Sequence, residues 1–178
     1  MEEKTLVEDR HSRTNQYGTQ LDTKFMVIVA VSLRREHYFE LLNVNECVNA
    51  ERYIEFLARM EAHFMKLHNP ILPENMRLQH DNATHHTAQL TQKYIEGRNT
   101  RIIRHPTYSP DLNLCDRYVF TRLEASRSKW DFNSKKDIEE FLSCKLPEFT
   151  AERMNKAPDN LVEHLGEVIS NGGIYITG

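Results

Sequence analysis

Residues Lys24–Leu33 read KFMVIVAVSL, a run in which nearly every side chain is apolar and many are β-branched. A strand with one face in water alternates apolar and polar side chains, whereas a strand covered on both faces is apolar throughout. The run therefore predicts a strand that is buried on both faces of a sheet. The segments on either side of it indicate the class of fold that contains this sheet.

A second strand is predicted directly after this run. The polar residues Arg34–Glu36 interrupt the apolar pattern, and His37–Leu42 (HYFELL) then reads as another short strand, so we expect a hairpin. Further along the chain, helix-forming and strand-forming segments alternate. They are predicted as a helix over 49–68, a strand over 76–80, a helix over 84–96, a strand over 101–104, and helices that begin near 116, 134 and 161. Strands that alternate with helices favour an α/β domain with a mixed sheet.

The length of the chain sets the number of domains. Its 178 residues are enough for one domain with its own hydrophobic core. Residues 1–23 are polar and contain the chain breakers Asn15 and Gly18. We therefore expect a polar lead-in over 1–23 and the sheet domain over 24–178.

Composition argues against several classes of protein. No apolar run is long enough to cross a bilayer, and the N-terminal MEEKTLVEDRH lacks the apolar core of a secretory signal, so no membrane partner is expected. Cys47, Cys115 and Cys144 share no short spacing. Such cysteines argue against a disulfide framework or a zinc site, and they suggest a reducing compartment.

Charge is distributed unevenly along the chain. The net charge of −3 does not by itself indicate a nucleic-acid-binding protein, but residues 93–129 contain eight Lys or Arg against four Asp or Glu. Residues 130–178 contain five against nine, so one basic segment stands in an acidic protein. This segment is either an ordinary solvated face or a surface that faces a polyanion such as DNA.

The stretch Leu78–Thr87, LQHDNATHHT, gathers a carboxylate, an amide and three histidines. Asp81 follows the predicted third strand, and functional residues of α/β sheets gather at strand carboxyl ends. On its own, however, Asp81 is explained more simply as a helix cap. His85 and His86 are adjacent and point about 100° apart on a helix, so they cannot bind one ion together, whereas His80 and His85 could.

A second motif, YSPDLNLCD at Tyr108–Asp116, lies downstream. Taken alone, its Ser-Pro and Pro-Asp pairs indicate a turn, with Asp111 as a local cap. Asp81 and Asp116 have 34 residues between them; the first follows a short strand and the second opens a helix. In this spacing and context the two motifs resemble those of the mariner branch of transposases. The catalytic carboxylates of that family stand in an HDN motif and at the end of a YSPDLxPxD motif.

The likeness extends over nearly the whole chain. VNAERY at Val48–Tyr53 is similar to the segment that opens the family's first helix. FNSKKDIEEFL at Phe132–Leu142 and SNGGIY at Ser170–Tyr175 resemble its C-terminal helices and tail. Paired motifs at this spacing, with matching segments on both sides, are a specific signal.

The resemblance implies an RNase H-like fold, a mixed sheet with flanking helices, and DNA cleavage and strand transfer by two-metal phosphoryl transfer. It implies that Asp81 and Asp116 are the catalytic carboxylates and metal ligands, with Asn82 and His80 as supporting neighbours. The implied cofactor is Mg²⁺ or Mn²⁺, since two such ions about 3.5–4 Å apart can hold the attacking and leaving oxygens. Hard cations of this kind prefer oxygen ligands, which fits acids at these two positions.

The chain also departs from the family pattern. The family has three carboxylates, and the first ends a strand upstream of the hairpin; because little chain precedes Lys24, we expect this first strand to be missing. Asp9 is the acid best placed to replace the first carboxylate, but its distance to Asp81 along the chain is too short for the family spacing. The family's N-terminal helix-turn-helix region is not found before Lys24, and Leu114 stands where the family has Pro.

Likeness and departures together lead to competing hypotheses. The main one is a truncated mariner-type catalytic domain, impaired because it lacks the first carboxylate and the DNA-binding region. The alternative is a non-enzymatic remnant that binds DNA or forms dimers. A further reading, an RNase H-like nuclease with its own specificity, needs a third acid as well.

The resemblance also implies partners and a location. DNA, in the family the transposon ends, is the expected partner of the basic segment. The residues expected to bind it are Arg101, Arg104, Arg117 and Arg122. A homodimer, or a heterodimer with full-length transposase, is the expected protein assembly, and a DNA substrate implies the nucleus.

Overall fold

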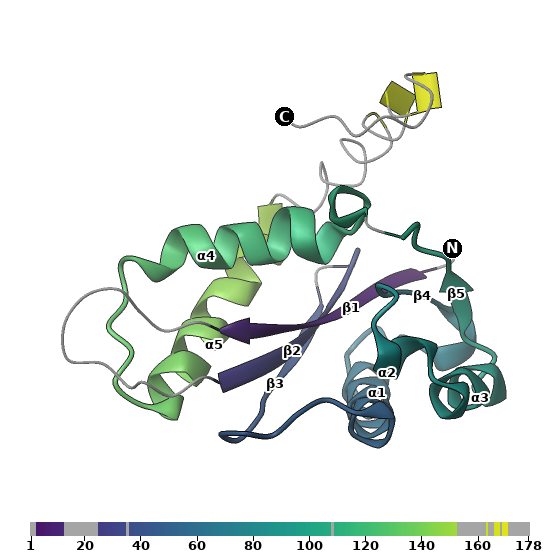
Figure 1. The fold of residues 1–178 in the computed structure, drawn as a ribbon, viewed down its shortest axis with the longest axis horizontal. Coiled ribbons are helices and arrows are strands. Elements are labelled where there is room, and N and C mark those ends of the chain that lie inside the picture. The colour runs from purple at the N-terminus through teal and green to yellow at the C-terminus, as the bar shows by residue number, and fades with distance from the viewer. Residues whose placement is uncertain are drawn as a thin grey trace.

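The computed structural model describes residues 3–12, 25–34, 36–107 and 109–152, together with residues 163, 166, 167, 169 and 170. Its main elements (Figure 1) are β1 Glu3–Ser12, β2 Phe25–Ser32, β3 His37–Leu41, α1 Ala50–Met65, β4 Met76–Gln79, α2 Thr84–Thr87, α3 Gln89–Gly97, β5 Arg101–Ile103, α4 Thr121–Arg127 and α5 Lys135–Glu152. Three single turns are the 3₁₀ turns η1 Pro73–Asn75 and η2 Pro110–Leu112 and the π-helical turn η3 Cys115–Phe120. The predicted helix near 161 and the segment Ser170–Tyr175 lie almost entirely outside the described residues.

The strands form one mixed sheet with the order β3-β2-β1-β4-β5. β1 and β2 are antiparallel, as are β2 and β3, so the expected hairpin of the second and third strands is confirmed. β1 and β4 are parallel, and β4 and β5 are parallel too. The predicted α/β class with a mixed sheet is therefore confirmed.

The strand β1 overturns one expectation from the sequence. It lies within residues 1–23, the segment expected to be a polar lead-in, and it is the central strand of the sheet, so the first strand is not missing. β1 pairs with β2 from Thr5–Ser32 to Ser12–Phe25, and with β4 from Glu3–Met76 to Leu6–Gln79. A buried β2 needs a neighbour on each edge, because unpaired backbone groups away from water are costly. Backbone pairing on both sides, and not an apolar pattern, places EKTLVEDRHS in the sheet.

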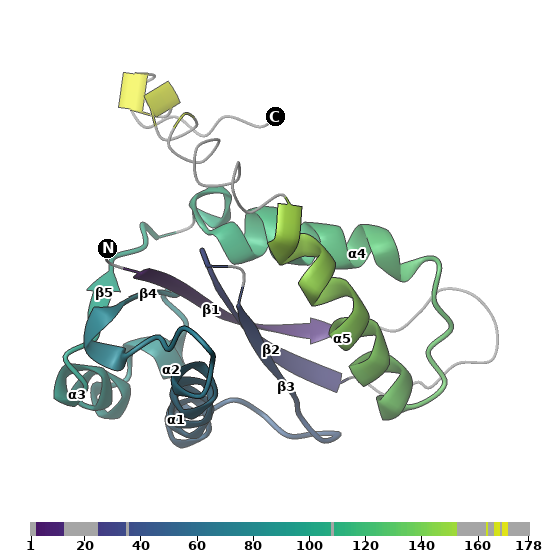
Figure 2. The ribbon, with the colours of Figure 1, turned by 180° about the vertical axis from the view of Figure 1, so that it is seen from behind.

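The hydrophobic core lies on both faces of β2, all of whose residues are buried. Its alternate side chains enter two separate clusters, as a strand with period two requires. Val27 and Val29 join the cluster that contains Leu123 of α4 and Phe141 of α5. Ile28 joins the other, which contains α1 and α3 residues. Figures 1 and 2 show these two helical layers on opposite sides of the sheet, so the strand buried on both faces is confirmed.

The helices largely follow the predicted pattern. α1 begins after Asn49, whose side-chain Oδ1 accepts a hydrogen bond from the backbone N–H of Arg52 (2.8 Å), and it ends before Asn69-Pro70. α5 begins at a reciprocal cap: the Ser134 N–H donates to Asp137 Oδ2 (2.8 Å), and the Asp137 N–H donates to Ser134 Oγ (3.3 Å). None of the described helices is long and apolar enough to cross a membrane.

The helix predicted over 84–96 is broken in two. Ala88 has an extended backbone (φ −56°, ψ 139°), which separates α2 from α3. Side chains of α3 replace the helical hydrogen bonds lost at the break: Thr91 Oγ1 donates to the carbonyl of His85 (2.6 Å), and Gln92 Nε2 donates to that of His86 (2.8 Å). Apolar periodicity alone could not indicate this break, because it depends on polar contacts between the two halves.

Candidate active site

The two acidic motifs of the sequence meet in one cleft. Asp81 lies two residues after β4, and Asp116 lies in the turn η3, which follows the loop after β5. Both line a cleft of about 390 Å³, together with Asn82, His105 and Ser109 among others. The fold therefore brings together two carboxylates with 34 residues between them, as the sequence analysis expects.

Two side-chain amides join the motifs to each other. Gln79, only 4% exposed, donates from Nε2 to the backbone carbonyl of Leu112 (3.0 Å). Asn82 donates from Nδ2 to the backbone carbonyl of His105 (3.0 Å). The end of β4 is thus bonded at two points to the chain that leads to Asp116. Asn82 was expected from the sequence as a supporting residue, whereas Gln79 was not.

The Asp81 carboxylate is held through one of its oxygens. Oδ1 accepts hydrogen bonds from the backbone N–H of Ala83 (2.9 Å) and from Nδ1 of His86 (2.7 Å). The bond from His86 is the main reason why the pKa of Asp81 falls from its ordinary value to about 2, although burial acts in the opposite direction. Asp81 is therefore ionised at neutral pH. Among the described hydrogen bonds none reaches Oδ2, which remains available to a ligand in the cleft.

Behind Asp81 lies a buried cluster of aromatic rings. The imidazoles of His80 and His86 are stacked, with centroids 4.5 Å apart and planes inclined by 13°. The hydroxyl of Tyr53, from α1, is hydrogen-bonded to Nδ1 of His80 (2.9 Å). Burial, and next the neighbouring His86, lower the pKa of His80 to about 3, so His80 is neutral at physiological pH. His80 is thus a buried neighbour of the site.

His86 is a residue that sequence reasoning missed. The sequence predicts only that His85 and His86 cannot bind one ion together, and it gives no prediction of a hydrogen bond from His86 to Asp81. The only indication in the sequence is its position five residues after Asp81, in the first turn of a predicted helix. From there its side chain can reach back to Asp81. That signal is weak without a structure.

Asp116 is held by a different local device. Asn113, 1% exposed, accepts from the Cys115 N–H at Oδ1 (2.9 Å) and donates from Nδ2 to Asp116 Oδ2 (3.3 Å). Asp116 then stands in the π-helical turn η3. π-helical turns are rare and often occur at functional sites. The loop before Asp116 is therefore ordered by hydrogen bonds even though Leu114 replaces the family's Pro.

The arginines expected to bind DNA belong to the segments that follow β4 and contain the acidic motif of Asp116. Arg101 and Arg104 are exposed on or just after β5, and Arg117 is exposed next to Asp116 in η3. Arg104 also lines a second hollow of about 570 Å³, which shares Asp81, Asn82 and His105 with the acidic cleft. Arg122 is less exposed, and its guanidinium lies 5.4 Å from the ring centroid of Tyr118. DNA binding by these four residues stays a prediction.

The backbone of β1 leads toward the acidic cleft. Its pairing with β4 ends at Leu6–Gln79; Asp9 lies three residues further along β1, and Asp81 two residues after Gln79. Asp9 therefore stands at the same end of the sheet as Asp81, in a strand that the sequence did not indicate. Its side chain lies outside the described set. Among the side chains that are described, no group of three His, Cys, Asp or Glu converges as a metal site.

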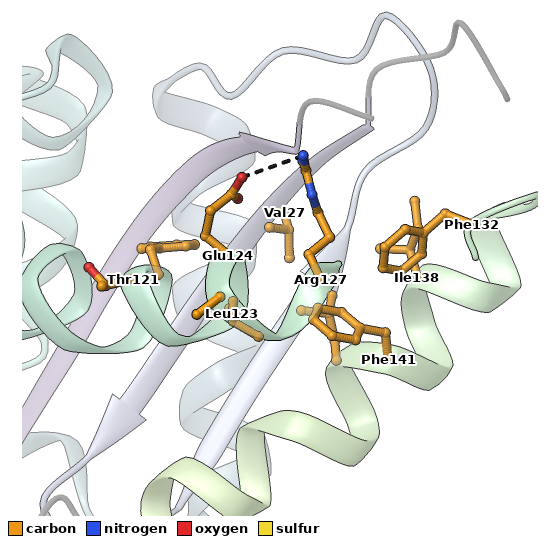
Figure 3. Close-up of a pocket in the computed structure, with 11 residues that line it drawn as sticks. Val27, Thr121, Leu123, Glu124, Arg127, Phe132, Ile138 and Phe141 are labelled. Carbon is orange, nitrogen blue, oxygen red and sulfur yellow. Dashed lines mark ion pairs between the residues drawn. The ribbon is translucent and has the colours of Figure 1, made fainter. Parts of the chain in front are cut away.

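A separate cavity of about 450 Å³ lies between β2, α4 and α5 (Figure 3). It is lined mainly by apolar side chains, including Phe132, Ile138 and Phe141. Its acid, Glu124, pairs with Arg127 at 3.4 Å. None of its lining residues belongs to the acidic cleft. Because phosphoryl transfer needs converging charged groups, the acidic cleft is the better candidate site.

Known proteins share this sequence pattern. A family model described as DDE superfamily endonuclease matches residues 6–139. The chain is similar to the Mariner Mos1 transposase of Drosophila mauritiana, 29% identical over 175 residues that cover 93% of this chain and 47% of the relative. It is also similar to the histone-lysine N-methyltransferase SETMAR of Homo sapiens, 26% identical over 172 residues that cover 87% of this chain and 25% of that protein. The chain therefore spans about half the length of the first relative and a quarter of the second.

Solved structures share the fold. The catalytic domain of Mos1 mariner transposase superposes with a TM-score of 0.79 at 22% identity, covering 98% of this chain and 84% of that one. The Mos1 paired end complex with Mn gives a TM-score of 0.82 at 22% identity, covering 98% of this chain and 56% of that one. The expected RNase H-like fold is thereby confirmed.

Proposed function

Because the chain belongs to the DDE superfamily endonucleases, we propose that it is the catalytic domain of a mariner-type transposase, which cleaves DNA and transfers the cut strand. The observation that carries this proposal is the meeting of Asp81 and Asp116 in one cleft of about 390 Å³. The two acids come from distant motifs, and carboxylates that converge on one hollow in this way can hold metal ions for phosphoryl transfer.

The donor set of the cleft fits a hard divalent cation. Carboxylate oxygens are the ligands that Mg²⁺ and Mn²⁺ prefer, and Asp81 is ionised at neutral pH because its pKa lies near 2. Asp81, through Oδ2, and Asp116 are the residues that would hold the cofactor. When bound, Mg²⁺ or Mn²⁺ supplies a Lewis acid for the phosphoryl oxygens and lowers the pKa of an attacking water or hydroxyl.

The rest of the site acts through position and charge. Gln79 and Asn82 bond the end of β4 to the second motif, which keeps the two carboxylates at a fixed separation. Arg104, one residue before the cleft residue His105, and Arg117, next to Asp116, are exposed and would bind the DNA backbone by pairing with phosphates. The proposed partner is DNA with transposon ends, as in the paired-end complexes of Mos1, and the proposed location is the nucleus.

We further propose that this chain alone cuts DNA weakly. The cleft holds the carboxylates of Asp81 and Asp116, and Asp9 is closer to Asp81 along the chain than the family spacing places the first carboxylate. A water molecule replaces each missing oxygen ligand, so the site binds the ion less tightly and holds it in a less defined position. The alternative is a non-enzymatic protein that binds DNA through its arginines or pairs with another copy or with full-length transposase.

Mn²⁺-dependent nicking of supercoiled plasmid tests the proposal. Asp81→Asn and Asp116→Asn keep side-chain size and remove the charge, so we expect nicking to fall at least about a hundredfold in each. Asp131→Asn, a change of an exposed acid outside the cleft, is the matched control and should nick as the parent does. Asp9→Asn tests whether β1 supplies a third ligand, in which case nicking should fall in this variant as well.

The outcomes separate the two functions. Nicking that is lost in the two cleft variants and kept in the control supports the transposase proposal. Equal nicking by Asp81→Asn and the parent chain would overturn it. No nicking by the parent, with salt-sensitive DNA binding that Arg104→Ala and Arg117→Ala weaken, would favour the non-enzymatic alternative.

A further inference from the structure

One imidazole sits directly against the candidate metal ligand Asp81. His86 is fully buried, with no exposed surface, and its Nδ1 lies 2.7 Å from Asp81 Oδ1. An ionised carboxylate only accepts hydrogen bonds, so His86 is the donor and carries a proton on Nδ1. The backbone N–H of Ala83 donates to the same oxygen (2.9 Å). Two donors on one oxygen fix the plane in which the carboxylate lies.

The imidazole itself has little room to turn. Its ring is stacked on His80 (4.5 Å between centroids), lies 4.4 Å from the ring of Tyr53, and meets His85 edge-on at 4.2 Å. Its backbone is held as well, because its N–H donates to the Ala83 carbonyl (3.0 Å). A donor packed on several sides can hold its acceptor in one rotamer, which a donor on a solvated side chain cannot.

We propose that His86, packed against His80 and Tyr53, is a positioning residue that fixes the Asp81 carboxylate so that Oδ2 remains available to the cation. This inference rests on the proposed role of Asp81 as a metal ligand. It gives a role to the histidines His80 and His86 of LQHDNATHHT and to Tyr53 of VNAERY. Hydrogen bonds to a ligating carboxylate commonly contribute 10- to 100-fold to metal affinity or activity.

The cluster also connects a distant element to the site. Tyr53 belongs to α1, and its hydroxyl is bonded to His80 Nδ1 (2.9 Å) while its ring contacts that of His86. α1 thus contacts the histidines beside Asp81 through Tyr53, although none of its residues lines the cleft. Loss of the hydroxyl alone should therefore act on Asp81 indirectly and weakly.

Two isosteric variants separate a positional role from simple packing. In His86→Asn the amide nitrogen can occupy the place of Nδ1, whereas in His86→Gln it occupies the place of Nε2 and cannot reach Asp81 Oδ1 in the same way. Both variants lose the ring and its packing. We expect His86→Gln to weaken Mn²⁺ binding about 10- to 100-fold and His86→Asn to restore it to within a few-fold of the parent.

The measurement is a Mn²⁺ titration of the full chain, followed by the electron paramagnetic resonance signal of free Mn²⁺, with nicking rates beside it. His68→Gln, a change of an exposed histidine, is the matched control, and Tyr53→Phe should weaken binding by only a few-fold. Equal losses in His86→Asn and His86→Gln would overturn the inference, because a purely structural role predicts that result. Asp81→Asn distinguishes the two proposals: if it leaves Mn²⁺ affinity unchanged, the ligand role itself fails, and the positional role with it.

A second measurement applies if His86→Gln does not fold. In the ¹⁵N-labelled parent chain, the imidazole of His86 should show a protonated Nδ1 whose proton signal is shifted downfield by its bond to the carboxylate. Asp81→Asn should move that signal back. A His86 ring protonated on Nε2 alone would overturn the inference.

Discussion

His80 shows at the scale of one residue how burial changes chemistry. It lies directly after β4, is 5% exposed, and has a pKa of about 3. In an unfolded chain the same imidazole takes up a proton near pH 6.5. At mildly acidic pH, His80 is therefore a neutral hydrogen-bonding and stacking group in the folded protein and a cation in the unfolded chain.

This difference predicts a pH dependence of stability. Between pH 7 and pH 5 the unfolded chain binds a proton at His80 and the folded chain does not, so the free energy of unfolding falls with falling pH. His80 alone contributes a loss of about 2 kcal/mol over this range. Burial also lowers the pKa of His37, which adds a loss of the same sign. Urea unfolding of the metal-free chain at several pH values measures the sum.

The contribution of His80 can be isolated by substitution. His80→Gln cannot take up a proton, so it should flatten the dependence on pH even where it lowers stability overall. His68→Gln, at an exposed position, should leave the slope as it is in the parent. An unchanged slope in His80→Gln would mean that His80 is protonated alike in both states.

At the scale of an element, the turn η3 explains why the change from Pro to Leu114 is tolerated. Leu114 has φ −64°, the value that proline imposes, and Asn113 before it is extended (φ −105°, ψ 119°), as a residue before proline must be. Among the described hydrogen bonds none uses the Leu114 N–H. The loop thus has a proline-compatible backbone without the proline, and the Leu side chain is buried in the core instead.

Leu114→Pro should therefore cost less stability than Leu114→Ala. Truncation to Ala leaves a cavity and should lower the free energy of unfolding by about 2–5 kcal/mol. Proline fills part of that volume. It also restricts the unfolded chain, which raises the free energy of unfolding by about 0.4–1 kcal/mol. Urea unfolding of the two variants checks the order. A proline variant less stable than the alanine variant would show that the turn needs a backbone proline cannot adopt.

At the scale of the whole molecule, β1 holds the sheet together. It is paired on both edges, with β2 and with β4, so the hairpin of β2 and β3 is joined to β4 and β5 through it. The acidic motif after β4 therefore depends on a strand whose sequence is polar. Loss of β1 pairing would separate the two halves of the sheet.

A proline in β1 should be far more damaging than one at the edge of the sheet. Leu6 is paired with Val31 on one side and Gln79 on the other, whereas Ile103 belongs to the edge strand β5. Leu6→Pro removes a ladder bond and leaves a buried partner unpaired, so it should lower the free energy of unfolding by about 2–4 kcal/mol. Ile103→Pro should cost less. Thermal unfolding followed by circular dichroism compares them, and a Leu6→Pro variant that melts like the parent would contradict the central place of β1.

The candidate site was predicted from the sequence only in part. Asp81 and Asp116 are recognisable because each sits in a motif with turn-forming neighbours, and Asn82 lies within the first motif. His86 and Asn113 are hydrogen-bonded to these acids and Gln79 bonds the two motifs to each other, yet nothing in their local sequence distinguishes them from ordinary polar residues. Their role depends on which groups the fold brings within 3.3 Å of them.

The sequence by itself determined the elements whose signal is local: the buried strand at Lys24–Leu33, the helix over 49–68, the helix that begins near 134 and the two acidic motifs. Each follows from side chains that are near neighbours along the chain, through periodicity and capping. Only the tertiary structure decided the place of β1 and the break at Ala88, and it also brought His86 to Asp81. These depend on contacts between segments or on bonds across a turn, and a polar strand enters a sheet because its backbone is paired on both sides, which no pattern of its own side chains reveals.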